Sequence, residues 1–123
     1  ASHYTLLLVE DEEIVRDTLG MIFAKRGFNV LQACDGVEAV KQYSENQNSI
    51  DVILMDLTMP RMNGMEASEK ICEINPDARI ILCSGYGVED AREKFAHCPF
   101  TAYVPTPFQI NALVHNTASL CTA

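Results

Sequence analysis

Several kinds of segment are missing from this sequence. It has no uninterrupted apolar run of the roughly 18 residues that a membrane-spanning helix requires. Its first residues do not combine a basic stretch with a long apolar run, so no secretory signal is indicated. No cluster of lysine and arginine occurs anywhere along the chain. These absences favour a cytoplasmic protein that does not enter a membrane.

Positive charge is scarce overall. The 123 residues include 9 Lys and Arg against 17 Asp and Glu, which gives a formal net charge of −8. A surface of this kind repels nucleic acids and anionic lipids unless a local basic patch intervenes. We therefore expect the chain to bind neither nucleic acid nor membrane directly.

The cysteines also lack a pattern that indicates disulfides or a metal site. Their number, 5, is odd, and no pair has the C-x-x-C spacing. We expect reduced thiols with a structural role, at positions 34, 72, 83, 98 and 121. The 3 histidines are scattered and show no metal-ligand spacing either.

What the sequence does contain is a regular alternation of two kinds of segment. Short apolar runs, some of them continuous in Leu, Ile and Val, are typical of strands buried on both faces. They predict strands over residues 5–9, 28–32, 51–55, 79–83 and 101–104. Helical spacing appears between and after them, in Val15-Leu19-Ile22-Phe23, Val37-Val40-Tyr43, Met65-Ile71-Ile74, Val88-Ala91-Phe95 and Ile110-Leu113-Val114-Thr117. Gly27, after Lys25-Arg26, is a typical helix stop.

This alternation predicts an α/β fold of the flavodoxin-like, doubly wound type. We expect five parallel strands in the order 2-1-3-4-5 with five helices on the two faces. One domain should span residues 1–123, with residues 1–4 as a leader that precedes the fold. In such sheets, ligands bind beyond the carboxyl ends of the strands, where the strand order reverses.

Acidic residues occur where this rule places a ligand. Glu10 and Asp11 follow the first strand, and Asp56 follows the third. Three carboxylates this close repel one another unless a cation neutralises them, and oxygen ligands favour a hard ion such as Mg²⁺. The alternative is that these acids are solvated loop residues, and the helix dipole alone accounts for Glu12 and Glu13.

The segment that begins at Asp56 carries further information. Asp56-Leu57-Thr58-Met59-Pro60-Arg61-Met62-Asn63-Gly64 ends a strand in an acid and continues in a loop with proline and glycine. Carboxylates at such exposed positions act as nucleophiles in proteins that form aspartyl phosphates.

Three motifs together carry a resemblance to a known family. LLLVEDE, DVILMDLTMPRMNG and IILCSGY are similar to the motifs of receiver domains in bacterial phosphorelay signalling, over residues 5 to 120. The resemblance implies that Asp56 accepts a phosphoryl group from a histidine kinase or a phosphotransfer domain. It also implies a Mg²⁺ site at Glu10, Asp11, Asp56 and the main-chain carbonyl of Thr58, with Asp11 as a direct ligand.

The same resemblance implies a conformational switch. Ser84 matches the hydroxyl that moves to bond the phosphoryl group, and Tyr103 matches the aromatic residue that follows it inward. A downstream partner would then bind the face formed by the fourth helix, fifth strand and fifth helix. No particular residue supports a homodimer, which stays an open option. The run Cys83-Ser84-Gly85-Tyr86 is most similar to receivers of hybrid sensor histidine kinases, and bulky Tyr86 predicts slow self-dephosphorylation.

The chain departs from the family pattern at one position. Family members have Lys-Pro after the fifth strand, where the lysine contacts the phosphoryl group, but this chain has Thr106-Pro107. Arg61 could approach the site instead. The alternative to ordinary phosphorylation is a pseudo-receiver, an interaction module that phosphorylation does not regulate. The Thr106-Pro107 bond is expected to be cis, as in the family.

Two other functions share parts of this pattern. An aspartate-nucleophile phosphohydrolase would need an Asp-x-Asp motif after its first strand, whereas here Asp56-Leu57-Thr58 follows the third. A flavin or dinucleotide carrier would need a glycine-rich first turn, and this first turn is Glu10-Asp11-Glu12-Glu13, which repels phosphate. We expect a phosphoacceptor domain rather than an enzyme.

Overall fold

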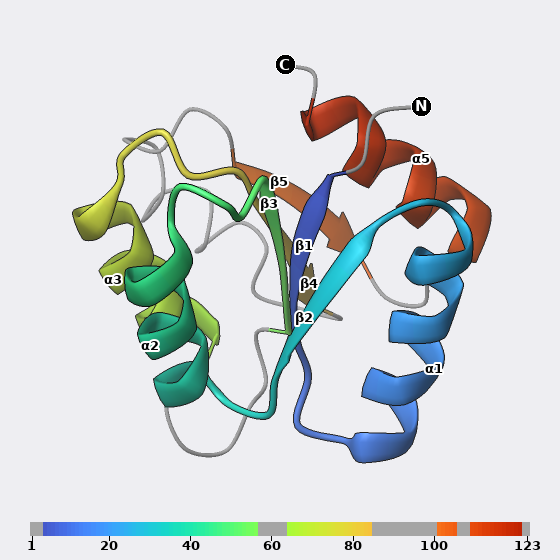
Figure 1. Cartoon of the computed structure of the whole chain (residues 1–123), viewed down its shortest axis with the longest axis horizontal. Coiled ribbons are helices and arrows are strands. Elements are labelled where there is room, and N and C mark those ends of the chain that lie inside the picture. Colours follow the sequence, from blue (N-terminus) through green and yellow to red (C-terminus); the bar gives the residue numbers. More distant parts are fainter. Residues whose placement is uncertain (1–3, 57–63, 85–100, 106–108, 122–123) are drawn as a thin grey trace.

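Five parallel strands form one sheet in the computed structural model of this chain (Figure 1). The structure describes residues 4–56, 64–84, 101–105 and 109–121. The strands are β1 (Thr5–Val9), β2 (Asn29–Ala33), β3 (Val52–Asp56), β4 (Ile80–Ser84) and β5 (Thr101–Pro105). Their order in the sheet is β2-β1-β3-β4-β5, which confirms the predicted doubly wound arrangement.

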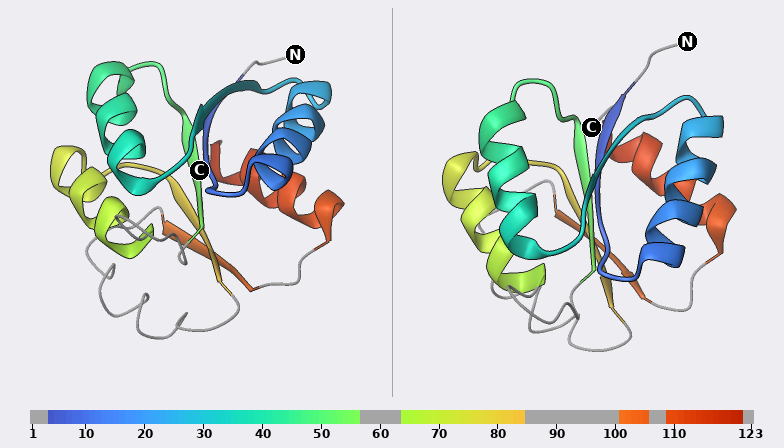
Figure 2. Two further views of the ribbon diagram at one scale, coloured as in Figure 1. Left: turned by 90° about the horizontal axis from the view of Figure 1, so that it is seen from below. Right: turned by 60° about the horizontal axis from the view of Figure 1, so that its bottom comes forward.

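The described residues include four helices, which cover both faces of the sheet. They are α1 (Glu13–Lys25), α2 (Gly36–Asn46), α3 (Gly64–Ile74) and α5 (Ile110–Cys121). α1 and α5 lie on one side of the sheet and α2 and α3 on the other, in all three views (Figures 1 and 2). The predicted helix around Val88, Ala91 and Phe95 lies outside the described residues.

The continuous apolar strands follow from this two-sided cover. Successive side chains of a strand point to opposite faces, so both faces of a central strand must be apolar when helices cover both. In β1, Leu6 and Leu8 belong to the cluster with Leu19 and Phe23 of α1. Leu7 and Val9 belong to the other cluster, with residues of α2 and α3.

The end of α1 confirms the predicted stop at Gly27. Its φ of 95° is left-handed, a conformation that glycine adopts without steric cost. The Gly27 N–H donates to Ala24 O and the Phe28 N–H to Phe23 O, each at 3.1 Å, which is the Schellman pattern. The rings of Phe23 and Phe28 then pack edge to face, 5.2 Å apart. Because Phe28 closes the helix, β2 begins at Asn29, one residue later than predicted.

Some apolar positions predicted to face the core are exposed instead. The exposed fractions are 37 % for Val15, 52 % for Val37 and 37 % for Ile74. Each of these residues lies in the first turn or at the last residue of its helix, whereas the buried residues Leu19 and Phe23 lie further inside α1. The spacing was therefore right about the helices and wrong about where their buried faces begin and end.

The cysteine prediction is only partly correct. Cys34, Cys83 and Cys121 form no disulfide, as expected. Cys72, in α3, is disulfide-bonded, so the expectation of a reduced thiol is wrong there. An odd count and the absence of C-x-x-C spacing do not exclude a bond between distant cysteines that the fold brings together. Cys98 lies outside the described residues. Within the described segments, no helix is long and apolar enough to cross a membrane.

The left-handed turn gives a direct test of the fold. We predict that Gly27→Ala lowers the free energy of unfolding by about 1–2 kcal/mol, because a Cβ is strained in this conformation. No atom lies within 4 Å of the added Cβ, so the cost is conformational. Urea unfolding measures it, with Gly27→Asn as the control, since asparagine tolerates this conformation better. Equal stability of the alanine and glycine proteins would contradict the assignment.

Candidate functional site

The candidate site lies where β1 and β3 end side by side. Both strands run toward the lower edge in Figure 1, where β1 leads into α1. The last registered pair of these strands is Val9 with Met55, so the next residue of each chain segment is an acid, Glu10 or Asp56. On its other side, Asp56 pairs with Cys83 of β4. The parallel register thus brings the main chains of Glu10 and Asp56 to one edge of the sheet.

Glu10 is held in place by contacts from three directions. Its N–H donates to Ala33 O, 3.1 Å away, which extends the pairing with β2. Its carboxylate Oε1 accepts from the Glu12 N–H at 3.3 Å, and its main-chain carbonyl accepts from Arg16 Nη1 at 3.0 Å. Glu12 is the N-cap residue of α1 and makes no cap bond with its own side chain. Glu10 therefore takes part in fixing the start of the helix.

Asp11 differs from Glu10 in its surroundings. It is exposed, in a bend between β1 and α1, and no described residue donates a hydrogen bond to its carboxylate. An exposed carboxylate on a main chain that is anchored at the preceding residue is well suited to bind a cation directly. That Asp11 of this acidic pair is a direct ligand stays a prediction.

The structure reaches only part of the predicted site. The main chain of Asp56 ends β3 and that of Ser84 ends β4, opposite Pro105 of β5. Tyr103 pairs with Leu82 in the middle of β5. The side chains of these three residues lie outside the described part, as do the whole of Thr58, Arg61, Tyr86 and Thr106 and the Thr106-Pro107 bond.

The chemistry of the donors at this edge fits a hard divalent cation. Glu10 and Asp11 offer only oxygen atoms, and Mg²⁺ is commonly held by one or two carboxylates together with waters and phosphate oxygens. The described residues contain no group of three or more His, Cys, Asp and Glu that could hold a metal ion. The side chain of the third predicted acid, Asp56, lies outside the described residues.

Sequence reasoning missed the role of Arg16. This half-buried residue of α1 contacts the loop that precedes the helix, through both its guanidinium and its main-chain N–H, which donates to Glu12 O at 2.8 Å. The available signal was the position of Arg16 three residues after Glu13 and four after Glu12, spacings at which side chains of a helix are neighbours.

A second loop at the same edge is also held by side-chain hydrogen bonds. Asp35 is the N-cap of α2, and its Oδ1 accepts from the Glu38 N–H at 2.8 Å. This is the usual way in which an aspartate satisfies a free donor at a helix start. Cys34 Sγ lies 3.5 Å from Glu38 Oε2 and 3.7 Å from Asp35 Oδ2. The end of β2 thus adds further acidic side chains to this edge of the sheet.

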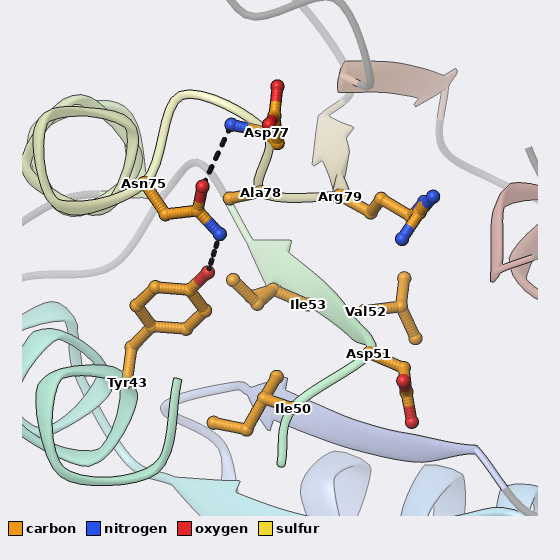
Figure 3. Close-up of a pocket in the computed structure, with 9 residues that line it drawn as sticks. All are labelled: Tyr43, Ile50, Asp51, Val52, Ile53, Asn75, Asp77, Ala78 and Arg79. Carbon is orange, nitrogen blue, oxygen red and sulfur yellow. Dashed lines mark hydrogen bonds between the residues drawn. The ribbon is translucent and has the colours of Figure 1, made fainter. Parts of the chain in front are cut away.

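A small cavity lies at the opposite end of the sheet, where β3 and β4 begin (Figure 3). Its volume is about 50 Å³, and its lining includes Tyr43 and Asn75. Asn75 Nδ2 donates to Tyr43 Oη at 3.0 Å, and the Asp77 N–H donates to Asn75 Oδ1 at 3.0 Å (Figure 3). Such a space suits one or two water molecules rather than an organic ligand. Its polar lining connects α2 to the turn after α3.

Cys121, at the end of α5, is not a reactive thiol. Burial, together with the nearby Asp51 carboxylate, raises the pKa of Cys121 to about 11, against a smaller lowering by Arg79. The thiolate is the nucleophilic form of cysteine. Since the thiol stays protonated near neutral pH, this position does not offer a second nucleophilic site.

The hydrogen bond of Tyr43 can be tested separately from the acidic edge. We predict that Tyr43→Phe destabilises the fold by about 1–3 kcal/mol, because the phenylalanine leaves the Asn75 amide without this acceptor. Tyr43 is only 2 % exposed, so the hydrogen bond is shielded from bulk solvent. Urea unfolding measures the loss, and Mg²⁺ affinity should not change. A change in Mg²⁺ affinity with unaltered stability would contradict this division of roles.

The fold and the motifs at its acidic edge are those of the receiver modules of two-component signalling. The chain belongs to the response regulator receiver domain family, whose profile matches residues 6–118. This confirms the resemblance derived from the motifs at Glu10, Asp56 and Ser84. Membership also decides against the two rival classes, the phosphohydrolase and the flavin or dinucleotide carrier.

Individual relatives agree with this assignment. The chain is 36 % identical over 110 residues to the chemotaxis protein CheY of Thermotoga maritima, covering 89 % of this chain and 90 % of that protein. It is 36 % identical over 111 residues to the autoinducer 1 sensor kinase/phosphatase LuxN of Vibrio campbellii, covering 90 % of this chain but 13 % of LuxN. A chain of the CheX–CheY–BeF₃–Mg²⁺ complex from Borrelia burgdorferi superposes with a TM-score of 0.83 at 29 % identity, covering 95 % of this chain and 88 % of that one.

Proposed function

We propose that Asp56 accepts a phosphoryl group from the phosphohistidine of a histidine kinase or a phosphotransfer domain. The observation that carries the proposal is the register of β1 and β3, which brings Glu10 and Asp11 next to the end of β3 in a chain of the receiver family. In doubly wound sheets, ligands bind beyond the carboxyl ends of the strands, at the point where the strand order reverses. These acids lie at that point.

The transfer is a displacement at phosphorus. A carboxylate oxygen of Asp56 forms a bond to the phosphorus atom, while the bond from phosphorus to the imidazole nitrogen breaks. The electron pair of the broken bond stays on that nitrogen, so the partner is left with an unmodified histidine. Positioning and charge stabilisation account for most of the catalysis in such transfers.

Glu10, Asp11, Asp56 and the main-chain carbonyl of Thr58 would hold the metal ion that the family uses. Bound Mg²⁺ neutralises negative charge on the phosphoryl oxygens during transfer. Asp11 is our candidate for a direct ligand, because it is exposed next to the anchored Glu10. Glu10, whose Oε1 also accepts from the Glu12 N–H, would combine metal binding with fixing the loop.

The phosphoryl group would then change a surface that partners recognise. In this proposal the Ser84 hydroxyl bonds a phosphoryl oxygen, and Tyr103 moves inward behind it. Their main chains lie on neighbouring strands, β4 and β5, which pair in parallel. The affected surface would include β5 and α5, where a downstream protein binds.

Thr106 supports a second candidate function. An ammonium about 4 Å from a unit negative charge is worth roughly 4 kcal/mol at an effective dielectric near 20. A hydroxyl that donates one hydrogen bond to a charged oxygen contributes about 1.5–3 kcal/mol, and the threonine side chain is shorter than lysine. Weaker phosphoryl binding would favour a pseudo-receiver that binds its partners without phosphorylation.

Intact mass spectrometry separates the two candidates. We predict that acetyl phosphate and Mg²⁺ add one phosphoryl group to the chain, and that Asp56→Asn abolishes the gain because the nucleophile is lost. Omitting Mg²⁺ should also prevent it. No gain in the natural sequence, followed by a gain in Thr106→Lys, would support the pseudo-receiver.

The metal site is tested by a second variant. We predict that Asp11→Asn weakens Mg²⁺ binding at least about tenfold, because an amide oxygen replaces a full negative charge at a hard cation. Isothermal titration calorimetry measures the dissociation constant. Asp17→Asn is the matched control, since it removes the same charge from an exposed position of α1 and should have a much smaller effect. Equal losses in both variants would indicate a general charge effect instead of a ligand.

A further inference from the structure

Arg16 connects α1 to the loop that carries the acidic pair. Its Nη1 donates to the main-chain carbonyl of Glu10 at 3.0 Å, although the two residues are six positions apart. Its own N–H donates to Glu12 O at 2.8 Å. The side chain is half-buried, so it is held against the protein and does not extend into solvent. The main-chain bond is the first of the helix and does not depend on the side chain, so the specific contribution of the arginine is its bond to the Glu10 carbonyl, on the amino side of Asp11.

The charges around Arg16 make this contact more than a local hydrogen bond. Residues 10–17 contain five acids and one basic residue, Arg16 itself. Repulsion among the acids favours conformations in which the loop spreads. A guanidinium bonded to the Glu10 carbonyl opposes this spreading from within the segment, and a charged donor makes a stronger bond than a neutral one.

We propose that Arg16 is a positioning residue for the cation site, which it serves without touching the ion. By holding the Glu10 carbonyl, it keeps the adjacent Asp11 carboxylate presented at the edge where β3 ends. This inference rests on the proposed Mg²⁺ site at Glu10 and Asp11. Under this proposal, α1 contributes to cation binding through Arg16, which is not itself a ligand.

Arg16 affects the affinity for a cation in two opposite ways. As a tether it favours binding, because an ordered ligand loses less freedom when the ion binds. As a positive charge it disfavours binding. The guanidinium is engaged with main chain at the Glu10 carbonyl, and the proposal holds that the tether outweighs the repulsion. The sign of the change on removing Arg16 therefore decides the question.

The experiment measures Mg²⁺ dissociation constants of the full chain by isothermal titration calorimetry. We expect Arg16→Met to bind Mg²⁺ about five- to tenfold more weakly, which is less than the full worth of a hydrogen bond from a charged donor, because Arg16 acts on the ion only through the loop. Arg16→Lys, which keeps the charge and a donor, should recover part of the affinity. Arg26→Met is the matched control: it removes the same charge at the other end of α1, where Arg26 Nη2 donates to Asn111 Oδ1 at 2.7 Å.

A second measurement reports on the loop without any metal. Heteronuclear NMR relaxation of the Asp11 and Glu12 amides should show increased motion in Arg16→Met and not in Arg26→Met. Tighter Mg²⁺ binding in Arg16→Met would overturn the proposal, because repulsion would then dominate. Lower thermal stability with unchanged affinity and unchanged amide order would overturn it as well, since Arg16 would then be only structural. Absence of Mg²⁺ binding in the natural sequence would instead contradict the proposed function, while the amide relaxation still tests the tether.

Discussion

The parallel pairing of β1 with β3 is the constraint on which the site depends. The two strands are far apart in sequence, yet their register continues to the last pair, Val9 with Met55, and both then reach an acidic residue. An antiparallel neighbour would place the two acids at opposite ends of the sheet. Parallel pairing requires a long crossover, which α1, β2 and α2 provide, and the helices need apolar strands beneath them. The buried residues of β1 and the position of the acids are consequences of the same arrangement.

The two ends of the sheet have different physical characters. At the amino ends of β3 and β4, Asn75 donates a hydrogen bond to Tyr43, and both residues line a small cavity (Figure 3). At the carboxyl ends of β1 and β2, acidic side chains follow the strands, and local contacts with Glu12, Arg16 and Glu38 hold the loops. The first end contributes stability, and the second exposes carboxylates on well-held main chain. A receiver domain needs a stable fold and exposed carboxylates on a fixed main chain, because a group that accepts a phosphoryl has to be accessible and held in a defined position.

The sequence was sufficient to predict most of the fold, for reasons that the structure makes clear. Continuous apolar runs identified the strands because helices cover both faces, and Gly27 identified the end of α1 because only a left-handed residue closes it in this way. The exposure of Val15 and Val37 was not predictable, since periodicity locates a helix but not the extent of its buried face. The bond at Cys72 and the contact of Arg16 with Glu10 depend on where distant atoms meet, which spacing alone does not reveal. For the site, the position of Glu10 and Asp11 next to the end of β3 follows from strand order, whereas the parts at Thr58 and Thr106 lie outside the described residues.

The proposed signalling function depends on one chemical event, the formation of an acyl phosphate at Asp56. Borohydride reduction after treatment with acetyl phosphate and Mg²⁺ converts an aspartyl phosphate to homoserine, which peptide mapping locates by mass. We predict homoserine at residue 56 and unmodified aspartate at residue 11. Homoserine at another acidic residue, with residue 56 unchanged, would contradict the central claim.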